Sequence, residues 1–422
     1  MAKKHKALKI VLATLGTIFI LIPSVFAVTN AIGNNSTISY ARTFSRVDYD
    51  DQLIPKEDEN GNYYFVTDRK FKVLQITDVH VGGGFLSFGK DRKALRAVAN
   101  MISYEKPDLV MVTGDVSFPV PYISGSFNNK KTVDIFASLM EQLGVYWTVS
   151  FGNHDAEAYN YFNRAKVSEF YQNEKYEYCL FKNGPTDIKG YGNQILNIKN
   201  SSGIITQTLF AIDSNAYLPD DPLGLKWHYD NVGQDQIDWY AREVEHLSNY
   251  NKKIIKNIKS ESTDETFKNF ERVSSLIFMH IPFQEMKDAW DEYANNNFTS
   301  TENVIFNGGE AGEKDPFVYP PVHQDELFET ILEKGSTTGV FFGHDHLNNF
   351  SLTYKGVTLS YGMSIDYLAY TDIDKYGSQR GCRVIEINPD SSWTTHLENY
   401  YQDKYNSNEE KQEVTFDPYY PV

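Results

Sequence analysis

The chain has 422 residues, of which 41% are hydrophobic and 14% aromatic, so it can build a sizeable core and is not globally disordered. Its formal net charge of −16 at pH 7 argues against nucleic acid as the main partner, because phosphate backbones require clustered cations. A small anionic substrate is compatible with this charge, since bound metal ions reverse the local charge.

The N-terminus predicts a segment that exports or anchors the chain. An uncharged apolar run at 10–28 follows four lysines, which are Lys3, Lys4, Lys6 and Lys9. This pattern is typical of a signal peptide, and the run is also just long enough to span a bilayer. Both interpretations of residues 1–31 place the rest of the chain outside the cytoplasm, secreted or anchored to the cell membrane, because the lysines stay inside. Residues 32–68 are predicted to be a linker.

From residue 69 the chain alternates between predicted strands and helices. Apolar runs predict buried strands and helical spacing predicts amphipathic helices, in the order strand 71–76, helix 94–102, strand 109–112, helix 133–143 and strand 145–149. This alternation predicts an α/β fold.

The second half of the chain continues the pattern less regularly, up to about residue 390. Further strands are expected at 208–212, 275–279, 339–342, 350–361 and 382–387, with helices at 236–247 and from about 325. Residues 250–272 are rich in Lys, Glu, Ser and Thr and predict a solvated insertion, and 288–322 predict loops. We therefore expect one domain at 69–390 and a C-terminal tail at 391–422.

The two cysteines, Cys179 and Cys382, lie far apart and form no CxxC pair. This spacing excludes a zinc finger or a redox dithiol. A single disulfide and two buried free thiols both remain open.

Polar clusters follow five of the predicted strands. They are Asp78-x-His80, Gly114-Asp115, Gly152-Asn153-His154-Asp155, His280 and Gly343-His344-x-His346. Each cluster alone is a weak signal, but ligands of α/β sheets bind at the carboxyl ends of strands, where all five are expected. Imidazole and carboxylate groups suit Zn, Fe and Mn rather than Ca. Two neighbouring ions need a bridging ligand, and the Asp115 carboxylate suits that role.

This set of motifs resembles the calcineurin-like metallophosphoesterases in order and approximate spacing over about residues 70–390. The segments 74–78, 236–239 and 280–282, together with Asn349, make it most similar to the small purple-acid-phosphatase-like proteins. The resemblance implies a four-layered α/β/β/α sandwich of two mixed sheets, with the site at the strand ends.

The resemblance also implies a role for each motif residue. Two divalent metal ions (Mn, Fe or Zn) would be held by two groups that share Asp115: Asp78, His80, Asp115 and His346 in the first, and Asp115, Asn153, His280 and His344 in the second. His154 would contact the phosphate and protonate the leaving oxygen, and Asp155 would orient His154. Purple acid phosphatases place an iron-binding tyrosine three residues after the bridging aspartate. Phe118 stands there in this chain, which favours a divalent pair over a ferric site.

The function implied is hydrolysis of a small phosphomonoester by attack of a metal-bound hydroxide. One alternative is a phosphodiesterase that acts on a cyclic nucleotide, a lipid headgroup or a wall polymer. Another is a catalytically silent, metal-stabilised binding protein at the cell surface. Trp227-His228-Tyr229, Tyr361 and Tyr367 are candidates either for the substrate pocket or for simple packing. No feature of the sequence fixes an oligomeric state.

Overall fold

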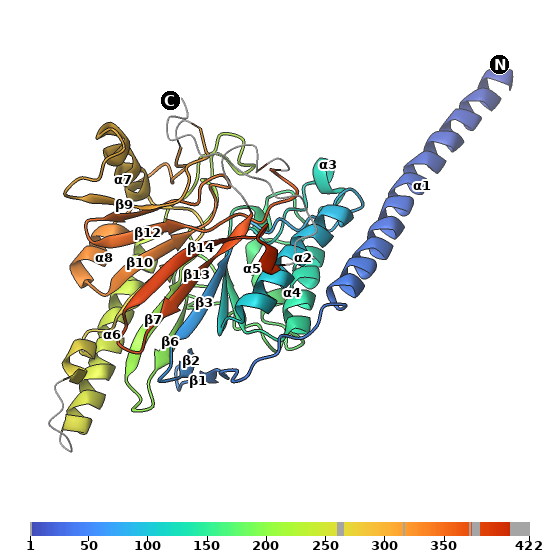
Figure 1. Ribbon diagram of the computed structural model, residues 1–422. Coiled ribbons are helices and arrows are strands. Elements are labelled where there is room, and N and C mark those ends of the chain that lie inside the picture. The colour runs from blue at the N-terminus through green and yellow to red at the C-terminus, as the bar shows by residue number, and fades with distance from the viewer. Residues whose placement is uncertain (1, 260–265, 315–316, 371–372, 374–379, 406–422) are drawn as a thin grey trace.

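Two β-sheets lie face to face with helices on both outer sides in the computed structural model (Figure 1). The structure describes residues 2–259, 266–314, 317–370, 373 and 380–405. The molecule thus has four layers, with one layer of helices on the outer side of each sheet. Each sheet contains both parallel and antiparallel strand pairs. The predicted α/β/β/α sandwich of two mixed sheets is confirmed.

The smaller sheet has five strands in the order β14-β13-β3-β4-β5. These strands are β3 (Phe71–Ile76), β4 (Leu109–Thr113), β5 (Trp147–Ser150), β13 (Gly381–Ile387) and β14 (Trp393–Asn399). β3, β4 and β5 are parallel neighbours, so their carboxyl ends meet at one edge of the sheet. Three of the predicted strands therefore deliver their polar clusters to the same place.

The larger sheet has nine strands in the order β1-β2-β6-β7-β8-β10-β12-β11-β9. They are β1 (Lys56–Glu57), β2 (Tyr63–Val66), β6 (Gln194–Lys199), β7 (Ile205–Ala211), β8 (Ser275–Phe278), β9 (Val304–Gly308), β10 (Thr337–Phe342), β11 (Ser351–Tyr354) and β12 (Val357–Tyr361). β7, β8, β10 and β12 run parallel in the middle of this sheet. β8 and β10 are followed by the remaining histidine motifs.

Helices cover the outer face of each sheet. On the smaller sheet they are α2 (Phe88–Glu105), α4 (Asn129–Leu143) and α5 (Arg164–Tyr171), and the end of α1 (Ala2–Ala41) packs on α2 and α4. On the larger sheet they are α6 (Gln234–Lys259), α7 (Gln284–Asn295) and α8 (Leu327–Lys334). Short turns complete the chain: α3 (Pro121–Ser124) and the 3₁₀ turns η1 (His154–Ala156), η2 (Thr266–Phe270) and η4 (Asp403–Tyr405).

The layers follow from side-chain alternation along the central strands. In β3, Val73 points into the core between the two sheets, whereas Leu74 and Ile76 pack under the helices. In β8, Phe278 enters the inter-sheet core and Ile277 packs against the outer helices. Strands buried on both faces read as continuous apolar runs, which is why the sequence pattern located them.

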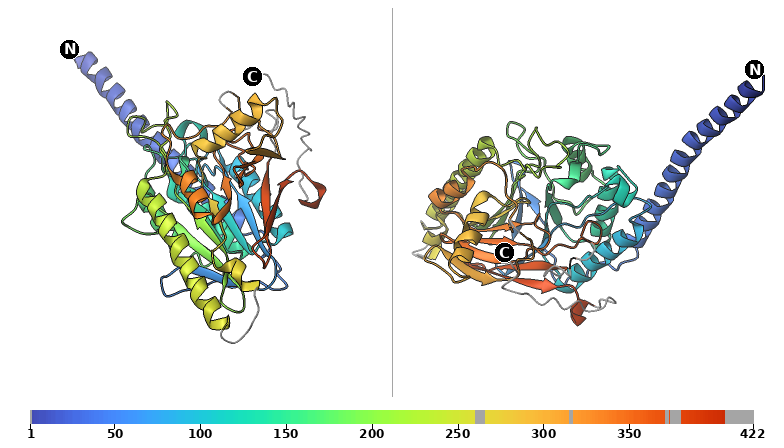
Figure 2. Two further views of the ribbon diagram at one scale, coloured as in Figure 1. Left: turned by 90° about the vertical axis from the view of Figure 1, so that its left-hand side faces the viewer. Right: turned by 90° about the horizontal axis from the view of Figure 1, so that it is seen from above.

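The predicted linker at 32–68 contains regular structure. α1 continues to Ala41, and its last turns bury Asn34, Thr37 and Ala41 against the domain. β1 and β2 then form the edge of the larger sheet, with β2 parallel to β6. The first half of α1 projects away from the sheets (Figures 1 and 2). Among the residues described, no helix is both long enough and apolar enough to cross a membrane.

Three other segments differ from the sequence prediction. α6 runs through the first part of the predicted insertion, because Asn251 and Ile255 are buried on its inner face. Residues 260–265 of that insertion lie outside the described residues. The predicted loop region 288–322 contains most of α7 and all of β9, and the predicted tail begins with β14.

Cys179 and Cys382 are both free and buried in the core between the smaller sheet and its helices. Burial raises the pKa of both thiols. Of the two alternatives that the sequence left open, the structure shows buried free thiols.

Candidate metal centre

The loops after β3 and β4 run side by side and bring the first aspartates and histidine together. The backbone N–H of Asp78 donates to Gly114 O over 3.2 Å, and that of His80 donates to Asp115 O over 3.0 Å. Asp78, His80 and Asp115 have φ angles of 51°, 51° and 53°, and His344 has a φ of 77°. A non-glycine residue in this left-handed region costs about 1–2 kcal/mol. Backbone strain at four predicted ligands is typical of a functional site.

The glycines of two motifs leave room for neighbouring ligands. Gly114 has a φ of +86°, and a Cβ there would lie 2.4 Å from His280 Nδ1. A Cβ on Gly152 would lie 2.1 Å from Asp115 Oδ1. The glycine in Gly-Asp and Gly-Asn is therefore needed for the close packing of these side chains.

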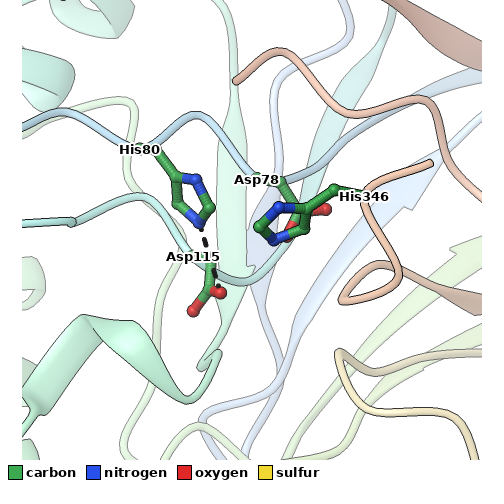
Figure 3. A group of neighbouring side chains, drawn as sticks. All are labelled: Asp78, His80, Asp115 and His346. Atoms are coloured by element: carbon green, nitrogen blue, oxygen red, sulfur yellow. Dashed lines mark hydrogen bonds and ion pairs between the residues drawn. The ribbon is translucent and has the colours of Figure 1, made fainter. Parts of the chain in front are cut away.

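Four predicted ligands form a compact, fully buried group: Asp78, His80, Asp115 and His346 (Figure 3). One candidate ligand atom from each lies within 4.8 Å of the others. His80 Nε2 is 3.4 Å from Asp115 Oδ2, and His346 Nε2 is 3.3 Å from Asp78 Oδ1. Figure 3 shows these side chains converging on one point from the loops after β3, β4 and β10.

The other three predicted ligands gather on the other side of Asp115. His280 Nε2 lies 3.2 Å from Asp115 Oδ2 and 3.1 Å from Asn153 Oδ1. His344 Nδ1 lies 3.0 Å from the same Asn153 oxygen. Asp115 thus stands between the two groups, in the position that the sequence analysis assigned to the bridging carboxylate.

The chemistry of this donor set fits divalent metal ions. The ion pairs described for Asp78 and Asp115 are made with histidines, and Asp78 Oδ1 is a buried atom without a described hydrogen bond. Burial, together with His280, holds the pKa of His344 well below its usual value, whereas the nearby carboxylates raise the pKa of His80, His280 and His346. Buried carboxylate, amide and imidazole groups in this number suit Zn, Fe or Mn.

His154 lies at the edge of the centre, but its carboxylate partner differs from the one predicted. His154 Nδ1 is 2.6 Å from Glu157 Oε1, and its backbone N–H donates to Asp115 Oδ1 over 2.8 Å. The ring packs edge-on against Phe118, with ring centres 4.9 Å apart. Glu157 therefore occupies the place that the sequence analysis gave to Asp155, because the η1 turn brings residue i+3 back beside His154.

Asp155 instead fixes the loops that carry the ligands. Its carboxylate accepts backbone hydrogen bonds from Asp115 and Gly152 on one oxygen, over 3.0 and 2.8 Å, and from Ser117 on the other, over 2.9 Å. Burial and the nearby Asp115 raise the pKa of Asp155 to about 6. Asp155 is thus a backbone anchor for the turn that presents Asp115.

Sequence reasoning missed several residues that contact the centre, among them Glu157, Tyr217 and Asp366. The side-chain amide of Asn153 donates to the Tyr217 hydroxyl over 2.7 Å, and this hydroxyl donates to Glu157 Oε1 over 3.3 Å. Asp366 Oδ2 lies 3.1 Å from His80 Nδ1. Glu157 follows the Asn153 motif closely in sequence, so its position could have indicated a partner for His154. Asp366 is a lone acid without a motif.

The aromatic candidates differ in whether they lie beside the metal centre or pack in the core. Tyr229 packs edge-on against His344, with ring centres 4.4 Å apart, and Trp227 is 64% exposed beside Tyr319. Tyr361 is buried and donates to Asp345, and Tyr367 packs beneath a guanidinium group. Tyr229 borders the centre, whereas Tyr361 and Tyr367 belong to the core.

Comparison with known proteins identifies relatives of this chain. A model of the calcineurin-like phosphoesterase family matches residues 71–348. The probable inactive purple acid phosphatase 14 of Arabidopsis thaliana is 27% identical over 344 residues, which is 76% of each chain. Phosphatase DCR2 of Saccharomyces cerevisiae is 27% identical over 352 residues, which is 76% of this chain and 52% of that protein.

A solved structure shares the fold. A dimetal phosphatase from Danio rerio superposes with a TM-score of 0.50 at 10% sequence identity, over 79% of this chain and 98% of its own. At this identity the likeness concerns the fold alone.

Proposed function

The chain belongs to the calcineurin-like phosphoesterase family, and on that premise we propose that it hydrolyses a phosphomonoester with two divalent metal ions held around Asp115. One observation carries this proposal. Every predicted ligand position is filled by a side chain able to bind a metal, and these side chains converge in a buried cluster with Asp115 at its centre. The yeast relative named as a phosphatase favours a monoester substrate.

Two divalent ions at this site would neutralise phosphoryl oxygens and lower the pKa of a bound water to about 7. The residues of the chain then have distinct tasks. Asp115 joins the two groups of ligands, and Tyr217 holds the amide of Asn153 so that its oxygen faces His280 and His344. Glu157 holds His154 at Nδ1, which leaves Nε2 free to donate a proton to the leaving oxygen.

The alternative of a silent binding protein has its own support, since several relatives carry the word inactive in their names. A protein that only binds its ligand does not need the complete set of metal ligands together with the His154–Glu157 pair. For this reason we favour an active enzyme.

Replacing the bridging carboxylate tests the proposal. The wild-type chain, loaded with Mn, Fe or Zn, should bind two ions and hydrolyse p-nitrophenyl phosphate. Asp115→Asn should lose at least one ion and about 10³-fold in kcat/KM, since metal stabilisation of the transition state amounts to several kcal/mol. Asp58→Asn, in a surface turn where Asp58 accepts only backbone N–H groups, is the matched control and should behave as wild type.

Three results would redirect the proposal. Fewer than two ions, with no hydrolysis after reconstitution, would overturn it. A strong preference for bis-p-nitrophenyl phosphate would establish the phosphodiesterase alternative. Two tightly bound ions with no turnover of either ester would favour the binding protein.

We also propose that the enzyme acts outside the cytoplasm. This rests on the four N-terminal lysines, on the uncharged run at 10–28 and on the projection of α1 from the domain (Figure 1). Fractionation of cells with a C-terminal reporter tests the proposal. A reporter found in the cytosol would contradict it.

A further inference from the structure

Asp366 lies in the segment that follows β12, and this segment is tied to the loop that carries Asp78 and His80. The backbone N–H of Ile365 donates to Thr77 O over 3.2 Å, and that of Asp366 donates to Asp78 O over 2.9 Å. The Asp366 side chain is fully buried behind the metal ligands. The backbone pairing therefore fixes Asp366 relative to the predicted ligands, although the two segments are far apart in sequence.

The carboxylate of Asp366 faces two predicted ligands at once. Its Oδ2 lies 3.1 Å from Nδ1 of His80 and 3.4 Å from Nδ1 of His346. The opposite nitrogens, Nε2 of His80 and Nε2 of His346, face the carboxylates of Asp115 and Asp78. Both rings thus lie between Asp366 on one side and the candidate metal position on the other.

The surrounding backbone prevents this carboxylate from turning. Oδ1 accepts hydrogen bonds from the N–H groups of Leu368 and Ala369, over 2.9 and 2.8 Å, and Oδ2 accepts one from Tyr370 over 2.9 Å. The guanidinium of Arg380 donates to the backbone oxygen of Asp366. Asp366 is therefore a rigid acceptor rather than a mobile acid.

We propose that Asp366 is a positioning residue that sets the tautomer and the orientation of both His80 and His346 for metal binding. A carboxylate beside Nδ1 holds the ring proton there and leaves the Nε2 lone pair directed at the metal. One aspartate serves two ligands of the same group. The inference rests on the metal centre of the proposed function, but it does not require hydrolysis.

Asp366→Asn should reverse this arrangement. An amide has only one acceptor oxygen, and keeping it on the Leu368 and Ala369 side preserves two of the three backbone hydrogen bonds. The NH₂ group then faces both imidazoles and donates to Nδ1, which moves the ring protons to Nε2. Since loss of such a partner typically costs 10–100-fold in metal affinity, we expect about that loss for one of two Zn²⁺ ions, measured by titration calorimetry and metal analysis.

Asp221→Asn is the matched control. The Asp221 carboxylate is also buried and also accepts three backbone N–H groups, from Leu225, Lys226 and His228. Both variants should unfold at a lower temperature, but Asp221→Asn should keep wild-type Zn²⁺ affinity. Asp366→Asn that folds and binds both ions as wild type does would show that Asp366 is only a loop anchor, and would overturn the proposal.

A measurement on the wild-type chain keeps the proposal testable if Asp366→Asn does not fold. In the Zn²⁺-loaded protein, ¹⁵N NMR should show His80 and His346 protonated at Nδ1 and coordinated through Nε2. Coordination of either ring through Nδ1 would overturn the proposal. A chain that binds two Zn²⁺ ions but hydrolyses no ester would contradict only the proposed function. A chain that binds no Zn²⁺ would contradict both the proposed function and the role of Asp366.

Discussion

At the residue scale, His154 shows how the chain supplies a partner for the imidazole that we propose as the proton donor. The position three residues after Asp115 holds Phe118, which packs against the rings of both His80 and His154 and offers no hydrogen bond. The acid that fixes His154 comes instead from its own turn, as Glu157. A carboxylate at Nδ1 holds the imidazole in one orientation and one tautomer.

Glu157→Gln tests this pairing. We expect kcat to fall by about 10- to 100-fold with little change in KM, because general acid catalysis contributes about 10²–10⁴-fold and the variant removes its orientation rather than the acid itself. Glu169→Gln, which removes an exposed carboxylate paired with Lys166 on α5, is the control. Equal activity of the two variants would contradict the assigned role.

At the element scale, the ends of the central strands decide how closely the ligands approach. The turn after β4 is compact because Gly114 adopts a left-handed conformation directly beneath His280. The following residue, Asp115, is left-handed as well. Two consecutive left-handed residues bend the chain sharply, so the carboxylate of Asp115 points back over the end of the sheet.

Gly114→Ala should disrupt metal binding more than it disrupts folding. The added Cβ costs about 1–2 kcal/mol for the left-handed backbone, and it also displaces His280. Gly356→Ala, in the β11–β12 turn, provides the comparison, because Gly356 has a φ of +85° with nothing within 4 Å of a Cβ. Metal loss is expected only in Gly114→Ala, which should also unfold at a lower temperature than Gly356→Ala, because its Cβ meets the Gly152 backbone at 2.8 Å and the bound ions no longer stabilise the fold. Metal retention in Gly114→Ala would contradict this account.

The last turns of α1 pack on the folded domain and are not a free tether. Asn34, Thr37 and Ala41 are buried, and the Asn30 amide donates to Gly125 O over 2.9 Å. A chain that starts at residue 22 should therefore unfold at the same temperature as the full chain. A chain that starts at residue 43 should unfold several degrees lower, because the apolar surface beneath α1 becomes exposed. Calorimetry of the two chains checks this, and equal stability would refute it.

At the scale of the whole molecule, the metal centre joins the two sheets. Asp78, His80, Asp115 and Asn153 follow strands of the smaller sheet, whereas His280, His344 and His346 follow β8 and β10 of the larger sheet. Ions bound there connect the two sheets at the open edge of the sandwich. The apolar core between the sheets holds them together over the rest of their area.

Metal removal should consequently destabilise the entire fold. At a free ion concentration of about 1,000 times Kd, each bound ion adds about 4 kcal/mol to the free energy of unfolding. Chelation should therefore lower the unfolding temperature by at least several degrees, and Zn²⁺ or Mn²⁺ should restore it. Asp115→Asn is the control and should respond much less to chelation. Thermal unfolding with and without chelator measures the effect, and an unchanged wild-type transition would contradict a centre that spans both sheets.

The sequence by itself predicted the alternation of strands and helices and the positions of the predicted ligands. The four layers were implied by the family resemblance, and the tertiary structure decided which residues support the ligands. Buried strands such as β3 and β4 appear as apolar runs, and the residues that follow them must reach the same edge, so a local pattern was sufficient. α7, β9 and the end of α1 have no such pattern, because they are half-exposed and are stabilised by distant partners. Asp366 meets His80 and His346 only after β12 has paired within the larger sheet, and no local signal encodes a contact between segments so far apart.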